Sequence, residues 1–222
     1  MKPSVICCGS LPYKNIDINE LVDSFDTIIR HNMLVPNCGY GRRDSTTQIL
    51  NNHVYDFYRK KVSLNRWYKM YTKHYNITRK HIKKFYDYIT QDKEDFHVIN
   101  FPTNNTEAMY DILEKNNIEL ELDLRILRCG LSSVIWAISN GVKPSLIGYS
   151  LTEENTTDHI YKKGGKINKK WHNDVEEFKL IKVLHEADLI DATLCCLEDE
   201  MKEGKYVLNP LLTLREESLD RL

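Results

Sequence analysis

Short apolar runs that end in glycine or polar residues recur along the chain, and stretches with helical periodicity separate several of them. The runs that predict strands span 4–10, 25–32, 45–51, 97–101, 120–127, 145–150 and 190–197. The first is an apolar run stopped by glycine and the second ends in polar residues, whereas 120–127 alternates as a half-exposed strand does. Residues 130–141 predict a helix closed by Gly141. Strands alternating with helices predict an α/β fold with a mostly parallel sheet covered by helices on both faces.

A clear amphipathic helix follows His172, and Asn173 or Asp174 is a good N-cap candidate for it. Its apolar residues recur at roughly helical spacing: Val175, Phe178, Ile181, Leu184 and Leu189. His172 therefore lies at a strand-to-helix junction, where α/β proteins usually keep their ligands. An imidazole there can take a proton from a substrate, although a lone histidine is more often a capping or core residue.

Length and composition suit a single domain over residues 1–222. The chain is 41% hydrophobic and 28% charged, with a net charge of -1, so the overall charge predicts no nucleic-acid partner. No apolar run reaches the roughly eighteen residues of a membrane span, and the N-terminus lacks a signal-peptide core. We therefore expect a cytoplasmic protein.

The cysteines and acidic residues predict no metal site. Of the six cysteines, Cys7–Cys8 and Cys195–Cys196 are adjacent pairs inside apolar runs, as expected of buried strand residues, and no CxxC spacing occurs. No DxD string occurs either. The nearest, ELD at 121–123, lies within an alternating run and is expected to be one exposed face.

Residues 53–89 differ from the rest of the chain. This region contains ten Lys and Arg residues but only two acidic residues, Asp56 and Asp87, so it carries a net charge of about +8 and the remainder of the chain about -9. It is also rich in aromatic residues. A basic, aromatic helical insertion is able to bind nucleic acid, an anionic membrane surface or an acidic glycan. Alternatively, it is a solvated helical subdomain whose aromatic residues form its core.

Polar residues and glycine follow the first two predicted strands. Gly9 and Ser10 follow the first, and Arg30 and Asn32 end the second. In a parallel sheet these ends converge at one edge, where backbone N–H groups and short polar side chains hold nucleotides. A plain tight turn at Gly9 explains the first of these features equally well.

Four segments, in order, resemble the motifs of sialyltransferases. VICCGSLPYKNID with FDTIIRHN, continued by GRRDSTTQILNN, is similar to their long donor-binding motif, and LRCGLSSVIWAISNGVKPSLIGYSL to their short motif. DHIY resembles the small His/Tyr motif, and HNDVEE contains a histidine followed five residues later by glutamate. The likeness runs from Ser4 to about Leu197, and covers both the animal enzymes and the smaller bacterial lipooligosaccharide enzymes.

This resemblance implies a single Rossmann-like nucleotide-binding fold and transfer from CMP-sialic acid with inversion, without a metal or other cofactor. His172 would be the general base. His159 and Tyr161 would stabilise the departing CMP phosphate. The residues implied in donor binding are Gly9, Ser10, Arg30, Asn32, Asn51, Cys129 and Gly130. Glu177 would support the helix or orient His172. These types suit the reaction, since imidazole removes a hydroxyl proton and a phenol hydrogen-bonds phosphate.

The chain departs from the family at two positions. Ser10 stands where asparagine is common, and Arg128 and Cys129 precede Gly130 where Ser or Thr is usual. Arg128 either grips a carboxylate or phosphate, or pairs with a nearby acid. The basic segment 152–171 is a candidate lid over the nucleotide, or else a surface loop.

The expected function is therefore a sialyltransferase-like glycosyltransferase, with a CMP-sugar donor and a glycan acceptor as partners. CMP-Kdo is the alternative donor, and a non-catalytic nucleotide-binding module is the alternative from another class. Region 53–89 would give peripheral association with the inner membrane. A nucleic-acid binder acting through that region is a third alternative.

Overall fold

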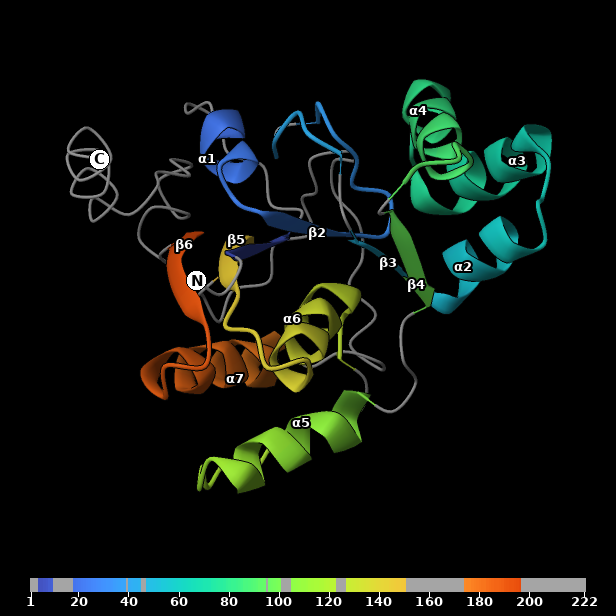
Figure 1. Cartoon of the computed structure of the whole chain (residues 1–222). Coiled ribbons are helices and arrows are strands. Elements are labelled where there is room, and N and C mark those ends of the chain that lie inside the picture. Colours follow the sequence, from blue (N-terminus) through green and yellow to red (C-terminus); the bar gives the residue numbers. More distant parts are fainter. Residues whose placement is uncertain are drawn as a thin grey trace.

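Six strands form one sheet, in which every pairing is parallel (Figure 1). This computed structural model describes residues 4–9, 18–38, 40–44, 47–94, 96–100, 105–122, 127–150 and 174–196. The sheet has the order β4-β3-β2-β1-β5-β6. Its strands are β1 (Val5–Cys8), β2 (Thr27–His31), β3 (Thr47–Leu50), β4 (His97–Asn100), β5 (Ser145–Ser150) and β6 (Asp191–Cys196).

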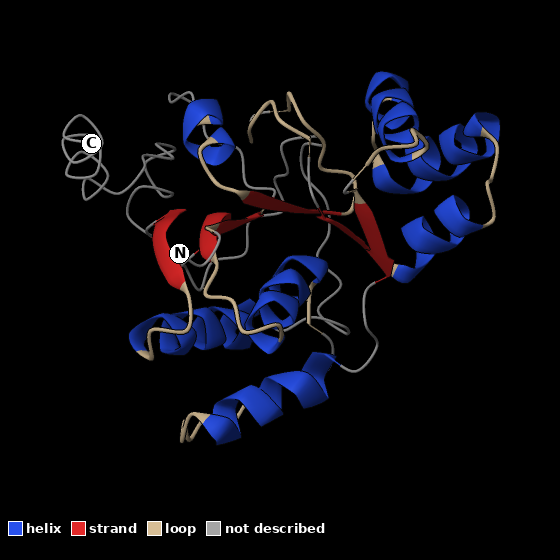
Figure 2. Ribbon diagram, in the orientation of Figure 1, coloured by secondary structure: helices blue, strands red, loops and turns tan. Residues whose placement is uncertain are grey.

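Helices cover both faces of this sheet (Figure 2). The helix α1 (Asn19–Asp23) lies on one face, and α5 (Asn105–Lys115), α6 (Cys129–Ser139) and α7 (Asp174–Glu186) lie on the other. The predicted α/β fold of the Rossmann-like kind is confirmed. Because β2 to β4 extend in one direction from β1, and β5 and β6 in the other, the strand order reverses between β1 and β5. Such a reversal marks the usual ligand position in open α/β sheets.

The central strand β1 is buried on both faces, as its unbroken apolar sequence predicts. Val5 and Cys7 contribute to the core under α5, α6 and α7, whereas Ile6 and Cys8 contribute to the core under α1. Both thiols are free and fully buried, and burial raises the pKa of Cys8 to about 12. These cysteines therefore serve as small apolar core residues, as the sequence predicted.

Three helices connect β3 to β4: α2 (Asn52–Arg59), α3 (Leu64–Tyr75) and α4 (Arg79–Ile89). The Asn51 side chain caps α2, and the Thr78 side chain caps α4. Their aromatic rings pack on one another, with Trp67 stacked on Tyr71 at 5.3 Å between centroids. The cluster also contains Leu50 of β3. The aromatic residues thus form a core continuous with the sheet, and a separable insertion over 53–89 stays a prediction.

The prediction of a strand at 120–127 is wrong for those of its residues that the structure describes. Residues 118–122 form no strand, and 123–126 lie outside the described residues. Leu120 and Leu122 pack against the core under α5 and α6, and Tyr110 of α5 donates a hydrogen bond to the Leu122 carbonyl at 3.2 Å. An alternating pattern indicates only that one face of a segment is buried. Here Leu120 and Leu122 are covered by the helical side of the core and not by neighbouring strands.

Gly9 permits the close approach of β1 and β5, and Gly148 permits that of Tyr40 to β5. The Gly9 N–H donates to the Ile147 carbonyl at 2.6 Å, and a Cβ at Gly9 would collide with the Gly148 backbone. Gly148 has a φ of +76°, and a Cβ there would collide with the Tyr40 hydroxyl. Side chains are therefore excluded at the point where the strand order reverses.

We predict that Gly148→Ala destabilises the protein far more than Gly141→Ala. Gly141 has nearly the same φ, +73°, but a Cβ there would meet nothing within 4 Å. Gly141→Ala should cost about 1–2 kcal/mol from the left-handed backbone alone. Gly148→Ala adds a collision in a packed core, for a total of about 2–5 kcal/mol. Urea unfolding of both variants measures the difference, and equal losses would contradict the packing role of Tyr40.

Candidate functional site

Several of the residues predicted to bind a nucleotide lie together at the carboxyl edge of the sheet, where the strands end. Gly9 follows β1, Asn32 follows β2 and Asn51 follows β3. Cys129 and Gly130 form the first turn of α6, which packs against β1, β2 and β3. The structure therefore brings these five residues from four separate segments to one edge.

Hydrogen bonds fix the two asparagines relative to each other. Asn32 has a φ of 47°, in the left-handed region that asparagine tolerates, and its N–H donates to the Ile49 carbonyl at 2.8 Å. Its side-chain Oδ1 accepts from the Asn51 N–H at 3.1 Å. The Asn51 Oδ1 in turn accepts from the Val54 N–H at 3.0 Å, which caps α2. Each asparagine thus supports the strand end that carries the other.

The N-terminus of α6 is tied to the sheet beneath it. The Gly130 carbonyl accepts from the Tyr149 hydroxyl at 2.9 Å and from the Ser133 hydroxyl at 2.5 Å. The Cys129 thiol lies 3.6 Å from the Ile49 carbonyl. A Cβ at Gly130 would lie 3.2 Å from Tyr149 and from His31, tighter than ordinary contact. Glycine therefore allows α6 to bring its positive end onto the strand ends.

His31 is a residue of this edge that the sequence analysis did not single out. It is the last residue of β2, is 6% exposed, and faces Gly130 through its Cε1 and Nε2 atoms. Its Nδ1 makes no hydrogen bond of normal geometry. Burial lowers the pKa of His31 to about 4, and an interaction with the Cys8 backbone opposes that shift. In the sequence, the position of His31 between Arg30 and Asn32, where the predicted strand ends, could have indicated that it lies at this edge.

The titratable groups packed around Gly130 are neutral near pH 7. His31 is an uncharged imidazole, and burial raises the pKa of Cys129 to about 12 and that of Tyr149 well above its usual value. Among the described residues, no group of three His, Cys, Asp or Glu side chains could hold a metal ion. An anion at this edge would meet the dipole of α6 and these neutral groups, beside the ion pair of Arg128 and Glu177 at the N-cap of α6.

Arg128 pairs with a nearby acid, Glu177. Glu177 is 4% exposed and lies in the first turn of α7. Its carboxylate accepts from the Arg128 backbone N–H at 2.7 Å and from the Arg128 Nε at 2.6 Å. Arg128 is the N-cap residue of α6. The ion pair therefore joins the beginning of α6 to the beginning of α7.

Arg30 lies on the opposite face of β2 from His31, because successive strand side chains alternate. Its guanidinium is fully buried and donates to the carbonyls of Tyr40 and Arg43, with 3.1 Å between Nη1 and the Arg43 oxygen. It holds the segment 40–43 against the sheet. The structure does not bring Arg30 together with Asn32, Asn51 and Gly130.

The remaining predicted site residues lie outside the described residues. They are Ser10, His159, Tyr161 and His172, together with the candidate lid 152–171. The predicted helix after His172 is present as α7, which begins at Asp174. The suggested N-cap Asn173 also lies outside the described residues, and the roles of all these residues stay predictions.

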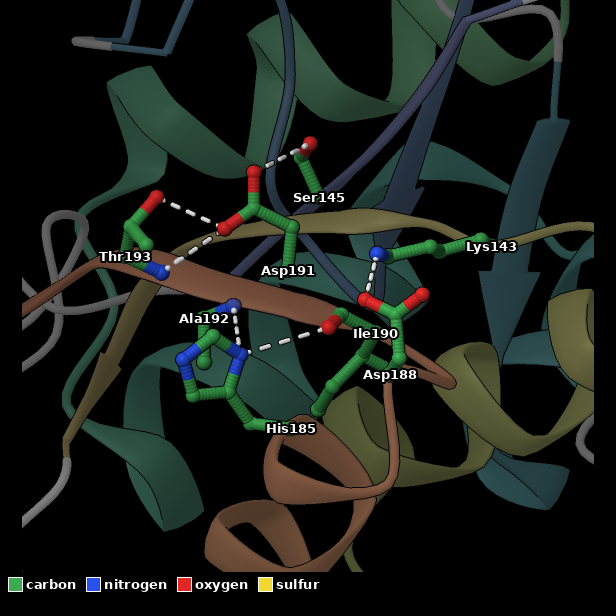
Figure 3. Close-up of polar contacts among 8 residues, drawn as sticks. All are labelled: Lys143, Ser145, His185, Asp188, Ile190, Asp191, Ala192 and Thr193. Carbon is green, nitrogen blue, oxygen red and sulfur yellow. Dashed lines mark hydrogen bonds and ion pairs between the residues drawn. The ribbon is translucent and has the colours of Figure 1, made fainter.

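A second polar cluster lies at the other edge of the sheet, where β5 and β6 begin (Figure 3). His185 Nδ1 lies 3.3 Å from both the Ala192 nitrogen and the Ile190 carbonyl. The Asp191 carboxylate accepts from Thr193 Oγ1 at 2.6 Å, and Lys143 pairs with Asp188. These contacts fasten the end of α7 to the start of β6, so we assign this cluster to stability.

Compared with protein-family models and with curated proteins, the sequence matches none of them. The fold alone therefore defines the class: an α/β protein with a Rossmann-like, all-parallel sheet in its described part. In that same part no helix is long and apolar enough to cross a membrane.

We predict that His31 makes the native state less stable as the pH falls. Its pKa is about 4 in the folded protein and about 6.5 when unfolded, so the unfolded state binds more protons between these values. Its contribution is intact above about pH 6.5 and is lost progressively as the pH falls toward 4. Between pH 7 and 5 the loss amounts to about 2 kcal/mol.

Urea unfolding at pH 7 and pH 5 tests this for the parent protein and for His31→Gln. The variant should lose about 2 kcal/mol less over that interval. Burial also lowers the pKa of His81, which adds a fall of the same sign to both proteins and cancels in the comparison. Identical pH dependence in the two proteins would show that His31 is not held neutral.

We also predict that Arg128 and Glu177 are energetically coupled. A double-mutant cycle with Arg128→Ala and Glu177→Ala should give a coupling free energy of about 1–2 kcal/mol, because one partner is buried. The matched control is the pair Lys182 and Glu186 on α7, which is 4.0 Å apart and exposed at both side chains. Its coupling should be at most about 0.5 kcal/mol. Equal couplings would contradict a structural role for the buried pair.

Proposed function

We propose that the protein is an inverting, metal-independent glycosyltransferase that moves sialic acid from CMP-sialic acid to a glycan hydroxyl. One observation carries the proposal: Gly9, Asn32 and Asn51 of the segments that resemble the long motif meet Gly130 of the segment that resembles the short motif at the carboxyl edge of a Rossmann-like sheet. That edge, beside the reversal of strand order, is where such folds bind nucleotides. The N-terminus of α6 suits the phosphate or the carboxylate of a CMP-sugar.

In the proposed reaction the acceptor oxygen attacks the anomeric carbon, and the bond from that carbon to the CMP phosphate oxygen breaks. His172 takes the proton of the acceptor hydroxyl. His159 and Tyr161 hydrogen-bond the departing phosphate. Each of these three assignments rests on the resemblance to sialyltransferases.

Glu177 is a positioning residue in this proposal. It lies five residues after His172, and its carboxylate binds the residue that begins α6. The ion pair supports a fixed position of α7, the helix that follows the proposed base His172, relative to the first turn of α6, which would face the donor. Arg128, engaged with Glu177, helps to set that relation, and Arg30 holds the segment 40–43.

We predict that the purified protein transfers sialic acid, and that His172→Ala lowers turnover by about a hundredfold or more while leaving CMP binding nearly unchanged. A general base acts on the acceptor proton and contributes little to binding of the nucleotide. The measurements are CMP release and glycan product with CMP-sialic acid and a panel of galactosides, together with calorimetric binding of CMP. His185→Ala is the matched control, since that histidine lies at the other end of α7 and should leave turnover intact.

The same assay with CMP-Kdo separates the alternatives. Kdo transfer without sialyl transfer would overturn the proposed donor. CMP binding without either transfer would indicate a non-catalytic nucleotide-binding module. Unchanged turnover in His172→Ala would remove that residue from the mechanism.

A further inference from the structure

The exposed face of α3 is a stripe of cations. Arg66, Lys69 and Lys73 are all exposed and follow one another at intervals of three and four residues, which places them on one face of the helix. Trp67 and Tyr71, on the opposite face, are buried in the core of the three helices. The sequence of α3 contains no acidic residue.

The acidic residues of the neighbouring helices do not neutralise this stripe. Asp56 pairs with Arg59 and Lys60, and Asp87 pairs with Lys83. Two further exposed cations, Lys61 before α3 and Lys80 in the first turn of α4, extend the positive charge beyond the ends of α3. The ion pairs therefore leave a concentrated positive surface over α3.

This arrangement is unfavourable in isolation. Lys69 and Lys73 are four residues apart, and like charges at that spacing destabilise a helix. The helix is stable in spite of them because its other face packs in an aromatic core. An external anionic surface would relieve the repulsion.

We infer that the α3 stripe docks the protein on an anionic phospholipid membrane. Delocalised attraction between several Lys or Arg side chains and acidic headgroups requires no pocket. Single-stranded nucleic acid is less suited, because its bases need several exposed aromatic rings beside the cations, and of the aromatic residues of α3 Tyr75 alone is exposed, whereas Trp67 and Tyr71 are buried. The inference does not depend on the proposed sugar transfer, although a membrane would suit an acceptor glycan carried on lipid.

Sedimentation with vesicles tests the inference. The parent protein should bind vesicles rich in phosphatidylglycerol, should not bind pure phosphatidylcholine, and should dissociate at about 0.5 M salt. The variant R66E/K69E/K73E should bind the anionic vesicles roughly a hundredfold more weakly, since three cations are lost at the surface. Circular dichroism of the variant establishes that it is folded.

The matched control is K115E/K182E, which reverses two exposed lysines, one on α5 and one on α7, and is compared with the two-residue α3 variant K69E/K73E. It changes the net charge by the same amount, and it should keep most of the parent's affinity for vesicles. Equal loss in both variants would overturn the assignment to α3. Equal binding to neutral vesicles, or binding to an oligonucleotide that anionic vesicles do not displace, would overturn the membrane as the partner. Vesicle binding requires no turnover, so its outcome is distinct from that of the transfer assay.

Discussion

The close approach of β1 and β5 is the constraint on which the rest of the structure depends. These strands flank the reversal of strand order, and their contact requires glycine at position 9, whereas glycine at position 148 makes room for Tyr40. Tyr40 fills the space beside Gly148, and Arg30 binds the Tyr40 carbonyl from β2. The face of the sheet under α1 is thereby tied to the strand ends that form the candidate site. Packing on one face thus determines the geometry available for binding at the edge.

Patterns with a single physical cause were predicted well from the sequence. The unbroken apolar run Val5–Cys8 became a doubly buried strand, and the periodic segment after His172 became α7. Gly9 and Asn32 lie at the edge where the ends of parallel strands meet, as predicted, whereas Arg30, predicted with them, binds the segment 40–43 instead. Patterns whose meaning depends on a distant partner were not predicted. In the described part of the alternating run, Leu120 and Leu122 pack against the core under α5 and α6 without forming a strand, and the partner of Arg128 lies 49 residues away.

The Arg30 and His31 pair shows why neighbouring residues can differ in role. Both end the same strand, but side-chain alternation directs Arg30 to the loop carbonyls and His31 to the first turn of α6. The sequence drew attention to the charged residue. The structure instead brings the neutral, buried one to the candidate site. A charged side chain is therefore not necessarily the one that lies at the candidate site. Here a group of cations lies over α3, whereas neutral groups such as His31 lie at the strand ends.

Asn51 connects those two regions through its own hydrogen bonds. Its N–H binds the Asn32 side chain at the sheet edge, while its Oδ1 binds the first turn of α2, the helix that leads into α3. A tilt of α2 relative to the sheet would have to distort one of these two bonds. One asparagine therefore contributes both to the hydrogen bonds of the candidate site and to the cap from which the chain enters the basic helices.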